Sequence, residues 1–250
     1  MTTPRSTVPE AAQKTALAWT HTARFLTTAS QLHQLPASEL PEIAFVGRSN
    51  AGKSTAINTM AQQKRLAFAS RTPGRTQHIN LFEVGPKDAP NALFADLPGY
   101  GYAKVERAAK LRWQEVMAQY LELRRPLHGV VMMVDSRLGF TDLDRRLLDL
   151  VAPRLANGEV RLLALLTKAD KLNRRDAEAA LAAAQEVLGA VATENSDLGV
   201  SLFSALSRRG VGDAAEVLHG WVHAAAPARE HADDAAPPPA DAAPAADPAA

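Results

Sequence analysis

The stretch GRSNAGKS, residues 47–54, fits the pattern G-x-x-x-x-G-K-S of a phosphate-binding loop. It follows the apolar run EIAFVG (42–47) and opens a predicted helix over residues 53–62. The two glycines let the backbone wrap an anion without a Cβ clash, so that the loop N–H groups and the helix N-terminus point at it. An ordinary glycine-rich turn is the alternative, and the strand before the loop and the helix after it disfavour that alternative.

Each residue type in this loop has a role in phosphate binding. Lys53 is expected to reach the β- and γ-phosphates, and the Ser54 hydroxyl is expected to ligate Mg²⁺. The predicted phosphate-binding residues are Gly47, Arg48, Ser49, Asn50, Ala51, Gly52, Lys53, Ser54 and Thr55.

The rest of the chain predicts an α/β fold in which strands and helices alternate. Six apolar runs read as strands, at residues 42–47, 79–84, 91–96, 127–135, 160–166 and 199–203. Helical spacing covers residues 53–62, 105–124, 143–155 (ending or bending near Pro153), 174–190 and 211–224. Near-continuous apolar strands between amphipathic helices indicate a mostly parallel six-stranded sheet with helices on both faces. Ligands of such sheets bind at the carboxyl ends of the strands, where every motif below falls.

The motif DLPGYG (96–101) follows a strand and suits a nucleoside triphosphate. Asp96 can hold Mg²⁺ through a water molecule, and the Gly99 N–H can sense the γ-phosphate. Leu97 and Pro98 complete the predicted contact segment. A plain Pro-Gly turn is the alternative.

Two further strand ends point to guanine. In TKADK (167–171), the Asp170 carboxylate can accept hydrogen bonds from both the N1–H and the exocyclic amine of guanine, while Lys168 lies along the base. FSAL (203–206) can place a backbone N–H on the guanine O6. The predicted base-binding residues are Thr167, Lys168, Ala169, Asp170, Phe203, Ser204 and Ala205.

The segment RTPGRTQHIN (71–80) lies between the loop helix and the second strand. Thr76 is the candidate for the second hydroxyl ligand of Mg²⁺, in a segment that would order on the γ-phosphate. The predicted contact residues here are Gly74, Arg75, Thr76, Gln77 and His78. A Pro-Gly turn with solvated arginines is the alternative.

Composition divides the chain into three parts. Residues 225–250 are dominated by alanine and proline, with four aspartates and one glutamate against one arginine. Such a segment cannot bury enough apolar surface to offset its chain entropy, so we predict a disordered acidic tail. We expect a flexible extension over 1–20 and one GTPase domain over 21–224. No cysteine, secretory signal or membrane-length apolar run is present, which favours a cytoplasmic protein without a membrane partner.

The segments PEIAFVGRSNAGKSTAIN, TPGRTQHINLF, DLPGYGYAK, LLTKADKL and FSA resemble the EngB (YihA/YsxC) family of bacterial GTP-binding proteins over residues 20–222. The resemblance implies a Ras-like P-loop GTPase with Lys53, Thr76 and Gly99 in catalysis and Ser54, Thr76 and Asp96 around Mg²⁺. It also implies a role in assembly of the large ribosomal subunit and a link to cell division and septation.

Three positions refine this prediction. Thr167 stands where most GTPases carry Asn in the base motif, and Tyr100 stands where Ras-like enzymes carry the glutamine that orients water. A phenol cannot orient water in the same way, so intrinsic hydrolysis is expected to be slow. In related loops the asparagine equivalent to Asn50 helps to bind K⁺; alternatively, Asn50 only tolerates a left-handed conformation.

Two other functions are kept open. One is a P-loop kinase or ATPase without a guanine site, and the other is a signalling GTPase whose partner is a protein and not a ribosome. A monomer is expected. Asp135, Asp142 and Asp144 read as strand-end and helix-cap residues. Arg124, with Arg125, reads as a solvated helix end, and contact with rRNA is the alternative.

Overall fold

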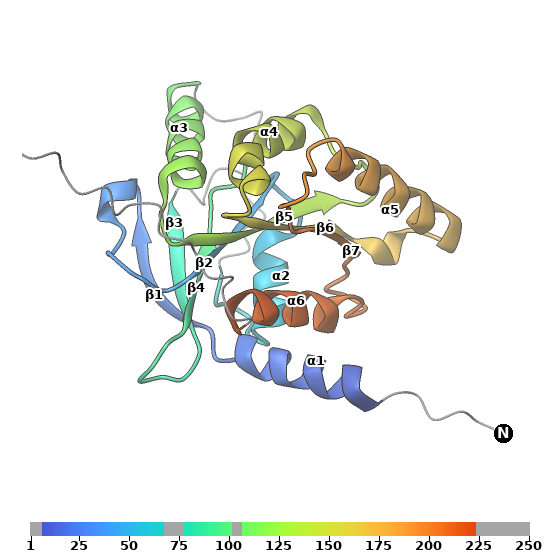
Figure 1. Ribbon diagram of the computed structural model, residues 1–250, viewed down its shortest axis with the longest axis horizontal. Coiled ribbons are helices and arrows are strands. Elements are labelled where there is room, and N and C mark those ends of the chain that lie inside the picture. The colour runs from blue at the N-terminus through green and yellow to red at the C-terminus, as the bar shows by residue number, and fades with distance from the viewer. Residues whose placement is uncertain (1–6, 68–77, 102–106, 224–250) are drawn as a thin grey trace, which may run out of the picture.

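The computed structural model describes residues 7–67, 78–101 and 107–223 (Figure 1). Its centre is a seven-stranded sheet with the order β1-β3-β4-β2-β5-β6-β7. The strands are β1 (Arg24–Ala29), β2 (Glu42–Gly47), β3 (Ile79–Val84), β4 (Ala92–Asp96), β5 (Leu127–Asp135), β6 (Arg161–Thr167) and β7 (Leu198–Leu202). The sheet is mostly parallel, because only β3 runs against its neighbours β1 and β4.

Helices cover both faces of the sheet, as the alternating sequence predicts (Figure 1). On one face lie α3 (Arg107–Leu123), α4 (Asp142–Ala156) and α5 (Arg174–Gly189). On the other face lie α1 (Thr7–Thr20), α2 (Lys53–Met60) and α6 (Val211–His223). Two short 3-10 helices, η1 (Leu32–Gln34) and η2 (Ala169–Lys171), lie in the connections. Alternate residues of the buried strands therefore enter two separate cores, such as Val46 in the first and Phe45 in the second.

The sheet has one strand more than the six that the sequence predicts. The additional strand, β1, forms an edge and pairs with β3, with an irregularity between Phe25 and Thr27. Phe25 is 58% exposed and the strand contains three polar residues, so it lacks the apolar run that identified the others. An edge strand buries too little surface to need such a run.

The sequence predicts a flexible extension over residues 1–20, whereas residues 7–20 form α1, which packs on α6. Ala16, Trp19 and Thr20 are buried. The Trp19 indole donates a hydrogen bond to Asn91 Oδ1 (2.9 Å). The helix is therefore held by buried side chains and long-range hydrogen bonds, one of them from Thr20 Oγ1 to Met60 O (2.8 Å). Residues 1–6 and the acidic tail lie outside the described residues.

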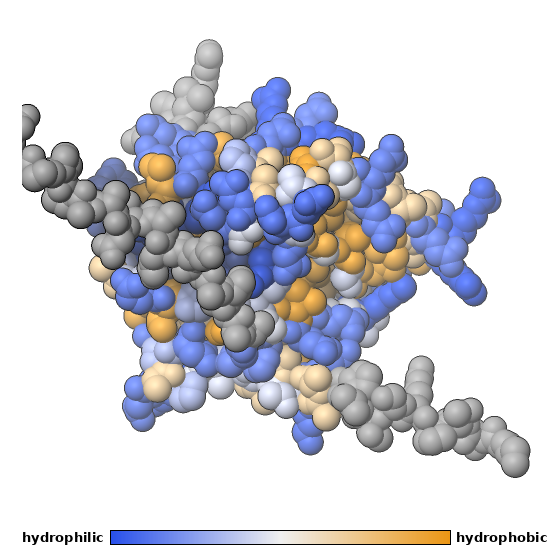
Figure 2. Space-filling view, viewed as in Figure 1, coloured by the Kyte–Doolittle hydropathy of each residue, from blue (hydrophilic) through white to orange (hydrophobic). Residues whose placement is uncertain are grey.

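Helix α4 continues past Pro153, where the sequence predicted an end or a bend, and stops at Ala156. Leu155, beyond the proline, is buried in the core. In the part of the chain that the structure describes, no helix is long and apolar enough to cross a membrane. Figure 2 shows hydrophilic residues over much of the visible face, with hydrophobic residues gathered toward α5 and β7.

Candidate nucleotide site

The phosphate-binding loop joins β2 to α2 at the carboxyl edge of the sheet. Gly52 caps α2 with φ 96°, a conformation that suits glycine. A Cβ at Gly47 would lie 2.8 Å from the Met133 Cβ, so glycine is needed for the close approach of β5. Asn50 has φ 64°, so the left-handed conformation that the sequence offered as one explanation of this asparagine is present.

The loop is tied to the segment after β4 by its main chain. Ser49 N donates to Tyr100 O (2.8 Å), and Tyr100 N donates to Gly47 O (3.3 Å). Within the described residues, Ser49 Oγ and Arg48 Nε are buried and have no hydrogen-bond partner. The loop backbone is therefore held in place by hydrogen bonds, while two of its side chains keep polar atoms that are unpaired among the described residues and that a polar ligand could contact.

Lys53 and Asp96 form a buried ion pair between Nζ and Oδ1. The lysine is 7% exposed and the aspartate is fully buried. The other oxygen, Asp96 Oδ2, is buried without a partner among the described residues. A buried carboxylate oxygen that lacks a protein donor fits a metal ion or a metal-bound water.

The donors here are those that Mg²⁺ prefers. Ser54 lies half-buried in the first turn of α2 and presents a hydroxyl, and Asp96 presents a carboxylate oxygen. Over residues 7–67, 78–101 and 107–223, no three His, Cys, Asp or Glu side chains gather into a metal cluster. One hydroxyl and one carboxylate oxygen from the protein suit a cation such as Mg²⁺, which takes its other ligands from phosphate and water.

The Tyr100 hydroxyl points into the N-terminal cap of α4. It donates to Asp144 Oδ1 (2.6 Å), while Asp144 Oδ2 accepts from Thr141 N (2.8 Å) and Thr141 Oγ1 (2.6 Å). Burial, together with the charge of Asp144, raises the pKa of Tyr100 well above its ordinary value. The phenol is thus committed to a structural hydrogen bond, and the assignment of Asp144 to a helix cap is confirmed.

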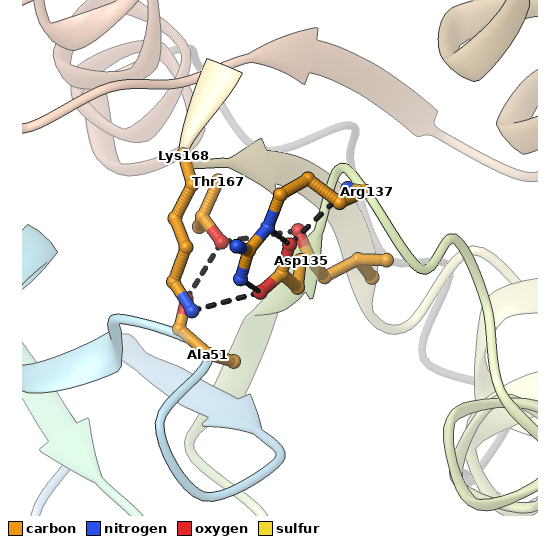
Figure 3. Close-up of polar contacts among 6 residues, drawn as sticks. Ala51, Asp135, Arg137, Thr167 and Lys168 are labelled. Atoms are coloured by element: carbon orange, nitrogen blue, oxygen red, sulfur yellow. Dashed lines mark hydrogen bonds and ion pairs between the residues drawn. The ribbon is translucent and has the colours of Figure 1, made fainter. Parts of the chain in front are cut away.

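Thr167 links the base motif to the phosphate-binding loop. Its Oγ1 lies 2.6 Å from Ala51 O and 3.1 Å from Val134 O (Figure 3). A single hydroxyl thus bridges the loop, β5 and β6. This contact gives a physical reason for threonine at the position where most GTPases carry asparagine.

The other base-motif residues are held against the loop after β7. Ser204 Oγ donates to Asp170 Oδ1 (2.6 Å), and Ala169 N donates to Phe203 O (3.1 Å). The Ser204 hydrogen bond is the main reason that the pKa of Asp170 lies below its ordinary value. Asp170 is therefore an oriented, ionised carboxylate.

The predicted residues converge at one edge of the sheet, with some differences. The phosphate-binding loop, Asp96 and Gly99, the base motif and the 203–205 segment all follow strand ends. The side chains of Leu97 and Phe203 lie in the hydrophobic cores, so only their main chains can face a ligand. His78 Nδ1 lies 2.8 Å from Ser30 Oγ, before β3. Gly74, Arg75, Thr76 and Gln77 lie outside the described residues.

Sequence reasoning missed an ion cluster beside the base motif. Asp135 ends β5 and pairs with both Lys168 Nζ and Arg137 Nη2, each at 2.7 Å from its Oδ2 (Figure 3). The available signal was the position of Asp135 at a carboxyl strand end, next to the strand that carries the base motif. Only the register, in which Asp135 lies opposite Thr167, makes them neighbours.

Comparison with known proteins agrees with this geometry. Residues 42–168 match a family model described as "50S ribosome-binding GTPase". The chain is 56% identical over 210 residues to a probable GTP-binding protein EngB from Albidiferax ferrireducens, covering 84% of this chain and 98% of that protein. A protein of the same name from Burkholderia thailandensis is 51% identical over 214 residues, covering 85% and 96%.

Solved structures support the fold alone, since their sequence identities are low. A probable GTP-binding protein EngB matches with a TM-score of 0.54 and 18% identity, over 72% of this chain and 98% of that chain. Era, in a complex with MgGDPNP and a segment of 16S ribosomal RNA, matches with a TM-score of 0.59 and 20% identity, over 76% and 59%.

Proposed function

Because the chain belongs to the EngB family of GTP-binding proteins, we propose that it is a slow, Mg²⁺-dependent GTPase that acts as a nucleotide-gated switch in assembly of the large ribosomal subunit. The observation that supports the GTPase part is the convergence of the loop, Asp96 and the base motif at the carboxyl ends of the strands, where Lys53 pairs with Asp96 and Thr167 contacts the loop. The kinase or ATPase alternative is disfavoured, because the chain matches GTP-binding proteins over most of its length.

In this proposal each residue near the phosphates has a separate role. The loop N–H groups and the N-terminus of α2 bind the phosphates. Lys53, which pairs with Asp96 in this structure, would turn to the phosphate oxygens. Ser54 and Thr76 would hold Mg²⁺ through their hydroxyls, and Asp96 would hold it through water. Bound Mg²⁺ neutralises negative charge on the phosphates. Gly99 N–H detects the γ-phosphate, and the 74–78 segment orders around it.

Hydrolysis is slow in this proposal because the residue after Gly99 cannot serve as a water-orienting group. The Tyr100 hydroxyl is held by Asp144 and lies at the start of α4. Efficient turnover therefore needs a group from outside the chain, such as one supplied by a bound partner.

Base selection is assigned to Asp170, with the main chain at Ser204 and Ala205 near the guanine O6. The first test is competition of GTP, GDP and ATP against a fluorescent GDP analogue. GTP and GDP should displace the probe at concentrations at which ATP does not. Equal displacement by ATP would remove the base-reading assignment.

The family description as a 50S ribosome-binding GTPase supports the large subunit as the partner. The test is co-sedimentation with separated ribosomal subunits in GTP, GDP or no nucleotide. We expect nucleotide-dependent pelleting with the large subunit, weakened by salt if phosphates are contacted. Equal pelleting with both subunits, unaffected by nucleotide, would favour a signalling GTPase with a protein partner. A monomer in the cytoplasm, linked to cell division and septation, completes the proposal.

A K⁺ ion beside Asn50 is proposed as the charge that assists hydrolysis. Hydrolysis should be faster in K⁺ than in Na⁺, and the difference should vanish in Asn50→Ala. Identical rates of the unmodified protein in the two salts would show that Asn50 serves only the left-handed loop conformation.

A further inference from the structure

An ion cluster joins Lys168 of the base motif to Asp135 and Arg137, two residues that have no role in the function described so far. Asp135 is the last residue of β5, and its neighbour in the sheet is Thr167, directly before Lys168. The two charged side chains therefore leave adjacent strands at the same edge. Lys168 Nζ donates to Asp135 Oδ2 at 2.7 Å (Figure 3).

Arg137 fixes the direction of the Asp135 carboxylate. Its Nε donates to Oδ1 (2.9 Å) and its Nη2 donates to Oδ2 (2.7 Å), while its backbone N donates to Oδ1 (3.1 Å). Although burial opposes ionisation, hydrogen bonds from Arg137 and Lys168 hold the pKa of Asp135 well below its usual range. A two-pronged arginine contact of this kind restricts the carboxylate to one orientation.

Lys168 is more exposed than the carboxylate that holds its ammonium, so its side chain can gain order from this contact. Its side chain is 33% exposed, against 10% for Asp135. Its backbone is left-handed, with φ 58° and ψ 29°. Figure 3 shows its stem running from the end of β6 past Thr167 toward Ala51, with the ammonium turned to Asp135. A free lysine samples many rotamers, and ordering such a side chain on binding weakens affinity.

We propose that Asp135, braced by Arg137, is a positioning residue for guanine nucleotide binding, holding Lys168 by its ammonium so that the lysine stem forms a fixed wall beside the base. This inference rests on the proposed role of the 167–170 segment in base binding. Asp135 acts through Lys168 and does not itself touch the nucleotide. The cluster orders the lysine before the ligand arrives, so less entropy is lost on binding.

The direction in which one substitution changes nucleotide affinity separates this proposal from simple electrostatics. Asp135→Asn removes a negative charge near a site for a polyanion, so Coulomb attraction alone predicts tighter binding. Loss of the anchor predicts weaker binding, by about fivefold and mainly through faster release. The measurement is the dissociation constant and release rate of a fluorescent GDP analogue. Unchanged or tighter binding in Asp135→Asn would overturn the proposal.

A matched control is Asp149→Asn, the same change of charge at an exposed position of α4. This variant should leave the release rate within about twofold of the unmodified protein, since a surface charge away from the cluster has a small effect. A release rate raised as much as in Asp135→Asn would show that charge alone, and not the anchor, sets affinity.

A double-mutant cycle shows whether Asp135 acts through Lys168. Lys168→Met keeps an apolar stem of similar length without the ammonium, so Asp135→Asn should have no further effect in that background. Equal weakening in both backgrounds would overturn the proposal, because a general structural defect would act with or without the ammonium. Melting temperatures of all variants identify such a defect directly.

If Asp135→Asn does not fold, Asp135→Glu tests the positioning role of Asp135 instead. It keeps the charge but moves the carboxylate by one methylene, so binding should again weaken. Affinity equal to that of the unmodified protein would overturn the positioning role. Failure of the base-reading assignment looks different, because the unmodified protein would then bind ATP as well as GTP.

Discussion

Two fully buried carboxylates lie at opposite ends of neighbouring strands and differ in their hydrogen bonds. Glu42 begins β2 and accepts from Tyr120 Oη (2.6 Å), Arg124 Nε (2.9 Å) and Arg124 Nη2 (2.6 Å). Asp96 ends the neighbouring strand β4, pairs with Lys53 through one oxygen, and has no partner for the other among the described residues.

We propose that this difference separates a structural charge, Glu42, from one that serves the nucleotide site, Asp96. A buried charge is tolerated when its hydrogen bonds are complete. Glu42 meets this condition, and it joins the start of β2 to Tyr120 and Arg124. A buried oxygen left unpaired is costly unless a ligand supplies the missing contact. Since both residues are fully buried, burial alone does not distinguish them, whereas the state of their hydrogen bonds does.

The largest expected effect comes from removing Glu42, whose hydrogen bonds are complete. Glu42→Ala leaves the Arg124 guanidinium and the Tyr120 hydroxyl without their acceptor, so the free energy of unfolding should fall by about 4 kcal/mol. The measurement is urea denaturation followed by circular dichroism. Asp197→Ala is the control: it removes an exposed pair with Arg161 and should cost less than about 1 kcal/mol. Similar losses in both variants would contradict the distinction.

The Asp96 carboxylate, which has one oxygen unpaired among the described residues, should have its main effect on the reaction. Asp96→Asn keeps the shape but removes the charge that orients the metal-bound water, so the Mg²⁺-dependent rate of GTP hydrolysis should fall several-hundredfold, on the order of 3–4 kcal/mol. The measurement is phosphate release across a Mg²⁺ titration. Asp88→Asn, an exposed acid beside the β3–β4 turn, should leave the rate unchanged. An unchanged Mg²⁺ response in Asp96→Asn would mean that Asp96 is structural, like Glu42.

Asp170 offers a third carboxylate, oriented by Ser204 and expected to take its remaining contacts from guanine. Asp170→Asn should weaken GTP binding about a hundredfold, because two hydrogen bonds to a charged acceptor are lost or reversed. Xanthine carries a carbonyl in place of the guanine amine, so the mutant amide should prefer xanthosine triphosphate. Competition titrations with GTP, XTP and ATP measure this change. Wild-type GTP affinity without a gain for XTP would show that Asp170 does not read the base.

A smaller effect is expected at Tyr100, whose hydroxyl donates a hydrogen bond to the Asp144 carboxylate next to the site. Tyr100→Phe removes the hydrogen bond to Asp144 and should lower the free energy of unfolding by about 1–2 kcal/mol. The GTP hydrolysis rate should stay within about twofold, since the hydroxyl lies in the α4 cap. Denaturation and single-turnover hydrolysis on the same sample test both statements. A large loss of rate at unchanged stability would place the phenol in the reaction.

The smallest effect concerns a partly buried histidine in the contact between α1 and α6. His219 stacks on His223 (ring centroids 3.9 Å apart) and meets the edge of Trp19. Burial and the charge of His223 lower the pKa of His219 below 6.5. Its contribution to stability is therefore complete above pH 6.5 and is lost as the pH falls through the lower pKa of the folded state.

Melting temperatures between pH 7.5 and 5 measure this loss. His219→Gln should reduce the dependence on pH, whereas His33→Gln, at an exposed position, should not. An unchanged profile in His219→Gln would show that His219 is not among the groups responsible.

The sequence by itself determined the Ras-like α/β architecture and the order of the nucleotide motifs, because both depend on local patterns. Apolar runs identify the buried strands wherever a strand is covered on both faces. Glycine, lysine and serine at fixed spacing identify the phosphate-binding loop, since few residue types tolerate that backbone and bind that anion. These patterns place Asp96 at the end of a strand, and Lys53 and Asp170 in the segments that follow strands, without any coordinates.

Only the tertiary structure decided which partners these residues meet. Nothing near Arg124 in the chain indicates Glu42, 82 residues away, so a side chain expected at a solvated helix end is instead 12% exposed in an ion pair. In the same way, the register of β5 on β6 brings Asp135 to Lys168. Helix α1 and strand β1 were missed because their stability comes from a neighbouring helix and a neighbouring strand, and such long-range contacts leave little mark on the local sequence.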